Sequence, residues 1–118
     1  MRLSLLSQSD DLAHVQCEGE ITQYQLAPGA DPLETLLGPG CFTRKVLFNL
    51  EKTTYIDSSG ISWLIVSHKH FLQGGGRLVI HSVPPLVNQV FQLLKMPLVL
   101  HIAADEAAAR ALAQGAQG

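Results

Sequence analysis

A chain of 118 residues is long enough for one domain with a real core, because at this size roughly two thirds of the unfolded surface can be buried. Its 47% hydrophobic and 15% charged residues exclude a disordered protein, and no apolar run approaches the roughly 20 residues that cross a bilayer. The net charge of -2, without a basic stripe, argues against direct nucleic-acid binding. We expect one domain over residues 1–118, located in the cytoplasm because the apolar residues 3–6 are too short a segment for a signal peptide.

Two short strands are predicted at the start of the chain, over residues 3–6 and 12–18. Polar turn residues separate them, so we expect an antiparallel pair. In the second strand two groups of residues alternate. We expect Ala13, Val15 and Cys17 to face the core and His14, Gln16 and Glu18 to face water. Residues 21–40 are the least regular part of the chain. One short helix is predicted within them, Pro32–Leu37. Its signals are Asp31 as the cap, Pro32 at the first helical position and Gly38 as the stop.

The centre of the chain reads as a buried strand that leads through a short loop into an amphipathic helix. Residues 46–50 are almost entirely apolar, which is typical of a strand covered on both faces, and the polar residues 51–54 predict a loop. The helix is indicated by a stripe at helical spacing formed by Ile61, Leu64, Ile65 and Leu72, with His68 between them.

Three residues at the joint between strand and helix are good helix caps: Asp57, Ser58 and Ser59, followed by Gly60. The side-chain oxygen of any of the three can accept a hydrogen bond from the free N–H groups of the first turn. Whichever residue caps, the other two lie near a helix N-terminus, which favours added negative charge. A serine hydroxyl at this place suits phosphorylation.

The second half of the chain alternates strands with helices. A turn at residues 74–76 precedes a strand at Arg77–His81, and a helix then runs from Pro85 to its stop at Met96, with Leu86, Val87, Val90, Phe91 and Leu94 on one face. A last strand over residues 98–102 and an Ala-rich helix over 105–114 follow. Such units imply parallel strands joined by right-handed crossovers. The expected fold is α/β, a mixed β-sheet of about five strands packed with about four α-helices, with the strand order left open.

Between the predicted strand and helix lies the run Tyr55-Ile56-Asp57-Ser58-Ser59-Gly60-Ile61, and three glycines and another strand follow the helix. This arrangement resembles the STAS domain, named for sulfate transporters and anti-sigma factor antagonists. The resemblance is specific over residues 46–100. Earlier, Gly19-Glu20-Ile21 is similar to the Gly-Glu-Leu-Asp that closes the second strand of the family, with Thr22 in place of the aspartate. In that family the first serine after the aspartate is phosphorylated, which here is Ser58.

The resemblance implies a bacterial anti-sigma factor antagonist, a phosphoprotein that regulates transcription by partner switching. Unphosphorylated, such a protein binds an anti-sigma factor that is also a serine kinase; phosphorylated on Ser58, it lets go, and a phosphatase is the third partner. ATP and Mg²⁺ would belong to the kinase, so we expect no cofactor in this chain. Two alternatives stay open: a STAS subunit of a stress-signalling assembly, or of an ABC-type lipid or anion transporter. The oligomeric state is not predicted.

Residues expected to contact the partner are Asp57, Ser59, Gly60 and Trp63. Trp63 lies nearly opposite the apolar stripe of the helix, beside Ser59 and Val66, so it is predicted to be partly exposed. One interpretation makes it an anchor for a protein partner, since tryptophan is enriched among interface hot spots. The other is that the irregular residues 21–40 cover it.

No catalytic or metal site is predicted. No Gly-x-Ser-x-Gly motif or recognisable set of nucleophile, base and orienting residue occurs, so we expect no enzyme. Of the five histidines, His68 and His70 are two apart on a helix and point to different faces, which disfavours a shared ion. Cys17 and Cys41 lack Cys-x-x-Cys spacing and are expected to be reduced, with Cys17 in the core.

Overall fold

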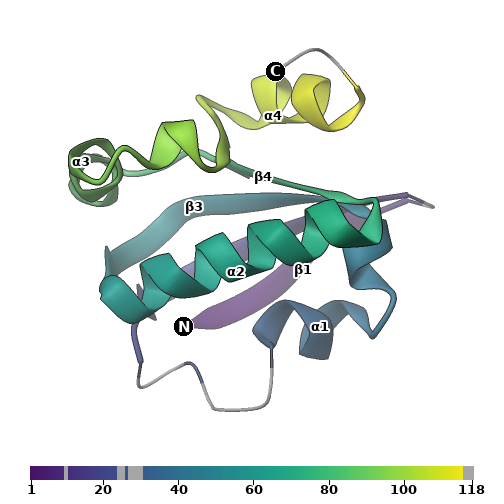
Figure 1. Ribbon diagram of the computed structural model, residues 1–118, viewed down its shortest axis with the longest axis horizontal. Helices are drawn as coiled ribbons and strands as arrows, with labels where there is room; N and C mark the ends of the chain where they lie inside the picture. Colours follow the sequence, from purple (N-terminus) through teal and green to yellow (C-terminus); the bar gives the residue numbers. More distant parts are fainter. Residues whose placement is uncertain (10, 24–25, 27–30, 116–118) are drawn as a thin grey trace.

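The structure is a computed structural model that describes residues 1–9, 11–23, 26 and 31–115 (Figure 1). Five strands form one sheet: β1 (Arg2–Gln8), β2 (Leu12–Ile21), β3 (Lys45–Ile56), β4 (Arg77–His81) and β5 (His101–Ala103). Four α-helices pack against it: α1 (Pro32–Leu37), α2 (Ser58–Gly74), α3 (Pro85–Leu93) and α4 (Glu106–Ala113). The strand order is β1-β2-β3-β4-β5, with β1 antiparallel to β2 and all other pairs parallel. The expected mixed α/β sheet is confirmed.

The sheet buries side chains on both faces. Alternate residues of β3 belong to the two sides: Val46 and Phe48 lie in the larger core with residues of α1, α2 and α3, and Leu47 lies in a smaller cluster with residues of α4. Figure 1 shows α2 and α4 on opposite sides of the strands. This double cover explains the nearly continuous apolar run at the start of β3.

The predicted helix ends are confirmed where they depend on local chemistry. Asp31 caps α1, its Oδ1 accepting from Leu33 N at 2.8 Å, and Asp105 caps α4 in the same manner through Ala108 N at 2.9 Å. At the other end of α2, Gly75 adopts the left-handed conformation (φ 86°) that a helix stop favours.

The loop predicted over residues 51–54 is wrong, because β3 continues to Ile56. β2 pairs with β3 along this whole length, up to Ile21 opposite Ile56, whereas β4 pairs only as far as Asn49. The polar residues therefore belong to a strand that has a neighbour on one side only, and most of them face water. Thr53 is the buried exception, and its hydroxyl donates to Cys17 O at 3.2 Å.

The prediction that His14 of β2 faces water is also wrong, because this residue is only 4% exposed. Helix α4 lies over this part of the sheet, and its Glu106 comes within 3.8 Å of the His14 ring. Cys17 is fully buried, as predicted.

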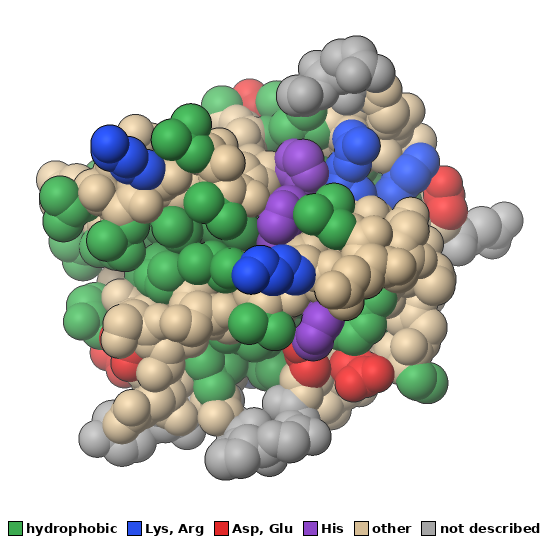
Figure 2. Space-filling view, in the orientation of Figure 1, with side chains coloured by type: hydrophobic (Ala, Val, Ile, Leu, Met, Phe, Trp, Pro, Cys, Tyr) green, Lys and Arg blue, Asp and Glu red, His purple; other side chains and the backbone are tan. Residues whose placement is uncertain are grey.

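Two helical stripes and the last strand differ from expectation. On α2 the side chain of Phe71 is buried and packs edge-on against Phe42, with the two ring centroids 5.1 Å apart. Its neighbour Leu72, which was expected in the stripe, is 56% exposed. On α3 only Val87 and Phe91 are buried, whereas Leu86 and, just after the helix, Leu94 face outward. Figure 2 shows hydrophobic side chains gathered on the surface over α3. Where the last strand was expected to begin, residues Met96–Leu98 form a 3-10 turn, and β5 is confined to three residues. The buried stripe of α2 is thus shifted from Leu72 to Phe71, and that of α3 is narrower than its sequence pattern.

Candidate functional site

The site lies at the junction between the end of β3 and the start of α2. Of the three possible caps, Asp57 is the one used: its backbone is extended (φ -105°, ψ -175°) and its Oδ1 accepts from Gly60 N at 2.9 Å. The helix therefore begins at Ser58, which leaves both serine hydroxyls free of the capping role.

Asp57 also ties the helix to the end of β2. Its second oxygen, Oδ2, accepts from Gln23 N at 3.2 Å, and its own N–H donates to Ile21 O at 3.2 Å. The segment with the family-like sequence Gly19-Glu20-Ile21 thus ends beside the serines. One carboxylate holds two chain segments that lie 34 residues apart.

Gly60 is buried because α2 comes very close to the end of β2 at this turn. A Cβ at Gly60 would collide with the Ile21 carbonyl oxygen and would lie 2.6 Å from Ile56 Cγ1. Only glycine fits this contact, so Gly60 sets the position of the helix start and of the serines on it.

Ser58 and Ser59 differ in their surroundings. Ser58, the first residue of α2, is exposed, and within the described part of the chain its hydroxyl has no hydrogen-bond partner. Ser59 is half-buried. The hydroxyl of Ser58 is therefore more accessible to another protein than that of Ser59.

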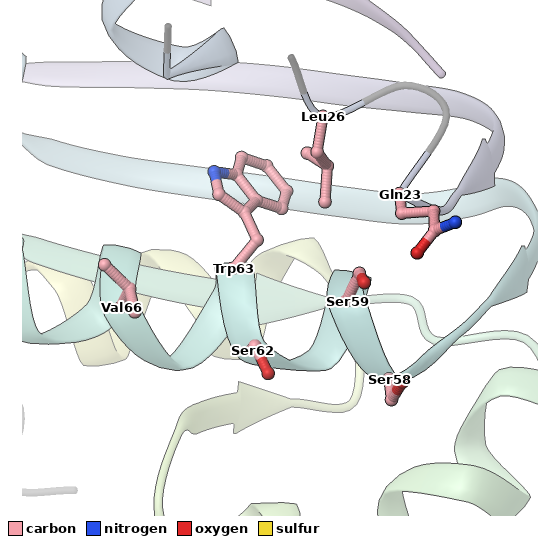
Figure 3. Close-up of a pocket in the computed structure, with 7 residues that line it drawn as sticks. All are labelled: Gln23, Leu26, Ser58, Ser59, Ser62, Trp63 and Val66. Carbon is pink, nitrogen blue, oxygen red and sulfur yellow. The ribbon is translucent and has the colours of Figure 1, made fainter. Parts of the chain in front are cut away.

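A pocket of about 450 Å³ lies next to the serines, between α2 and the residues that follow β2 (Figure 3). Seven described residues line it: Gln23, Leu26, Ser58, Ser59, Ser62, Trp63 and Val66. None of these seven carries a charge, and the lining mixes hydroxyl groups with apolar side chains. Such a hollow suits an uncharged side chain of another protein.

Trp63 forms a wall of this pocket and also reaches the core. Its ring packs edge-on against Phe48, with centroids 5.8 Å apart, while Figure 3 shows the same ring beside Leu26 and the rest of the pocket. Trp63 is half-buried, so the predicted partial exposure is confirmed, and the irregular segment supplies part of its surroundings through Leu26. Residues 24, 25 and 27–30 of that segment lie outside the described residues.

Helical spacing would have found part of the pocket from sequence. Ser59, Ser62, Trp63 and Val66 follow one another at intervals of three, one and three residues, so they share the outer face of α2. Gln23 and Leu26 carried no such signal, because they belong to an irregular segment whose path depends on tertiary contacts.

The histidines do not gather into a metal site. No group of three or more metal-ligating side chains occurs among the described residues. His68 and His70 point to different faces, as expected: His68 is buried and packs against His101 at 5.1 Å, and exposed His70 packs against Phe42. Burial lowers the pKa of both His68 and His101. Within the described part of the chain no helix is long and apolar enough to span a membrane.

Residues 6–109 match the STAS domain family, which extends the resemblance from the centre of the chain to its first strands. The chain belongs to the STAS domain family. Within this STAS domain, the Asp57-Ser58 junction lies at the start of α2, and the residues that close β2 lie beside it.

Solved structures of other proteins share the fold of this chain. The anti-sigma factor antagonist SpoIIAA in its unphosphorylated form has 19% sequence identity and a TM-score of 0.66, over 97% of this chain and 99% of that one. The Bacillus cell fate determinant SpoIIAA in its phosphorylated form has 19% identity and a TM-score of 0.65, over 94% and 99%. A candidate anti-sigma factor antagonist from Thermotoga maritima has 15% identity and a TM-score of 0.79, over 92% of each chain. At these identities the likeness shows a shared fold.

Proposed function

We propose that this STAS domain is an anti-sigma factor antagonist that acts in the bacterial cytoplasm by partner switching, with Ser58 as its phosphorylation site. The observation that most supports this proposal is that the Ser58 hydroxyl is exposed at the first residue of a 17-residue helix and lies beside an uncharged pocket. The domain itself is a non-enzymatic regulator: the anti-sigma factor kinase supplies ATP and Mg²⁺, and a phosphatase restores the hydroxyl.

The helix start tolerates the phosphate. A phosphoserine brings about -1.5 to -2 charges at neutral pH, and the N-terminal end of a helix stabilises a negative charge by roughly 0.3 to 1 kcal/mol at exposed positions. Asp57 has already satisfied the Gly60 N–H, and its charge nearby reduces this gain. The expected net effect on the free energy of unfolding is small, so phosphorylation leaves the fold intact.

The same charge opposes a protein partner. The partner surface we propose contains Ser58, Ser59, Asp57 and Trp63, and binding removes water from it. Burying an unpaired charge there costs several kcal/mol, and each 1.4 kcal/mol lowers affinity about tenfold. Release after phosphorylation thus follows from desolvation, without any change of fold.

The four residues predicted from sequence to bind the partner, Asp57, Ser59, Gly60 and Trp63, have different roles in this proposal. Trp63 and Ser59 line the pocket and contact the partner directly. Asp57 and buried Gly60 act by position: the first holds the helix start against Gln23 N, and the second allows the close approach to Ile21.

Phosphorylation by the cognate kinase tests the site. Incubated with kinase and ATP, the domain is expected to gain one phosphate on Ser58. Ser58→Ala should abolish the modification, whereas the matched controls Ser59→Ala and Ser62→Ala, on the same face of the helix start, should retain it. Localisation of the phosphate to Ser59 by mass spectrometry would overturn the assignment.

Titration of the partner tests the switch. Unmodified, phosphorylated and Ser58→Asp proteins should melt at closely similar temperatures, and the phosphorylated form should bind at least tenfold more weakly. Equal or tighter binding of the phosphorylated form would refute release and would indicate a phosphate-dependent scaffold instead.

A further inference from the structure

Two buried histidines meet on the α4 face of the sheet, away from the serine site. His14 of β2 and His81 of β4 are 4% and 1% exposed, and their Nε2 atoms lie 2.9 Å apart. They come from strands on either side of β3, whose inward residues here, Leu47 and Asn49, are uncharged. The proposed function uses neither ring.

The 2.9 Å separation limits how many protons the pair can hold. Only one hydrogen fits between the two Nε2 atoms, so one ring donates and the other must present a bare nitrogen. The neutral pair satisfies this condition, and so does a pair with one extra proton on an outer nitrogen. A pair with both rings charged would point two N–H groups at each other, in addition to the repulsion of like charges.

The groups around the pair belong mainly to α4. Glu106 Oε2 lies 3.8 Å from His14 Nδ1 and is itself paired with Arg110 at 2.8 Å, Asp105 caps the same helix, and Ser82 Oγ lies 2.8 Å from His81 Nδ1. Burial lowers the pKa of both histidines, and Arg110 adds to this effect, while the attraction of Glu106 only partly offsets it.

Helix α4 covers the face of the sheet that holds the pair. Its buried side chains, Ala109 and Ala113, pack in one cluster with Leu47 and Val79 of the sheet, which are fully buried. A hydrogen bond from Arg77 Nη1 to Leu112 O, at 2.6 Å, adds one polar contact. Release of α4 therefore costs free energy, because it exposes these apolar side chains to water.

We propose that His14 and His81 form a proton-sensitive latch beneath α4, such that acid raises the population of a state in which α4 has left the sheet while the α2 face stays folded. When α4 leaves, water reaches both rings, and each can take up its own proton. With an ordinary pKa near 6.5 for each exposed ring, a fall in pH from 7.5 to 5.5 raises the population of the open state by at least about five- to tenfold relative to a closed state that admits one proton. The gain is larger because burial lowers the pKa of both rings in the closed state.

Hydrogen exchange tests the latch. Protection factors of the α4 amides, corrected for the intrinsic rate at each pH, are measured at pH 7.5 and 5.5 in the unaltered protein and in its variants. In the unaltered protein α4 protection should fall by at least about five- to tenfold. In His14→Gln and His81→Gln only one ring can gain a proton when α4 opens, so the fall should be about five- to tenfold smaller than in the unaltered protein. The control His70→Gln, at an exposed histidine, should retain the full fall.

An NMR titration of the histidine rings in the unaltered protein keeps the test independent of whether the variants fold. While the α4 amides remain protected, the pair should take up at most one proton between pH 7.5 and 5. Two protonations with α4 still protected, or equal pH dependence of α4 in unaltered and His14→Gln proteins, would overturn the proposal.

Discussion

Gly60→Ala reverses the usual effect of an alanine in a helix. In most helical positions this change stabilises a protein by up to about 1 kcal/mol. Here the added Cβ meets the Ile21 carbonyl oxygen, Ile56 Cγ1 at 2.6 Å and Ile21 Cγ2 at 3.0 Å, and the first of these is backbone that cannot rotate away. The start of α2 must move from the end of β2, which also lengthens the bond between Asp57 Oδ2 and Gln23 N.

Overpacking of this kind costs about 1 to 3 kcal/mol, and the shifted hydrogen bond adds about 1 kcal/mol. The higher helix propensity of alanine offsets part of these two costs. We therefore expect the free energy of unfolding to fall by about 2 kcal/mol and Tm to fall by about 8 °C in a domain of this size. Urea and thermal unfolding measure both quantities. The matched control Ser62→Ala, exposed two residues later in the same helix, should leave Tm unchanged or slightly raised. A Gly60→Ala protein as stable as that control would refute the close approach.

Asp57→Ala should lower the free energy of unfolding by about 1 to 2 kcal/mol in urea, because the Gly60 and Gln23 N–H groups lose their acceptor; an unchanged midpoint would contradict the cap. Trp63→Phe should keep the edge-on packing on Phe48 and most of the stability but weaken partner binding by about 1 kcal/mol or more, measured by titration; unchanged affinity would place Trp63 outside the interface. Native Cys41 should resist alkylation at pH 8, since burial raises the pKa of its thiol to about 11, and rapid labelling without urea would disprove its burial. Burial lowers the pKa of His68 and His101, so below pH 6.5 the unfolded chain binds more protons than the folded one, and stability should fall as pH drops from 7 to 5; a flat profile would refute the shifts.

The start of the candidate site was predictable because its causes are local. Asp57, Ser58 and Ser59 all favour a helix cap, and the apolar run before them favours a strand, so the strand-to-helix joint follows from neighbouring residues. Which of the three would cap did not follow, since the choice depends on the contact between Asp57 and the distant Gln23.

The pocket could be predicted only in part. Its helical wall, from Ser59 to Val66, follows from the 3.6-residue repeat of a helix. The opposite wall follows the end of β2, and its position depends on the close contact of Gly60 with Ile21. A sequence pattern records a glycine, but it does not say which backbone the glycine approaches.

The errors in the fold share one physical cause. His14 was expected in water because alternation describes a strand with one covered face, and nothing near it in the sequence announces that α4 lies above. Residues 51–54 were expected in a loop because they are polar, yet pairing with β2 holds them extended. In both cases a partner far along the chain decided the environment.

By itself the sequence determined the α/β class, the ends of α1 and α4, the family resemblance and the place of Ser58 at the start of a helix, because capping, periodicity and turn chemistry act over a few residues. Only the tertiary structure decided the strand order, the pocket beside Trp63 and the meeting of His14 with His81. These features depend on segments brought together by the whole sheet, and on the close distances at which steric contact, burial and charge act.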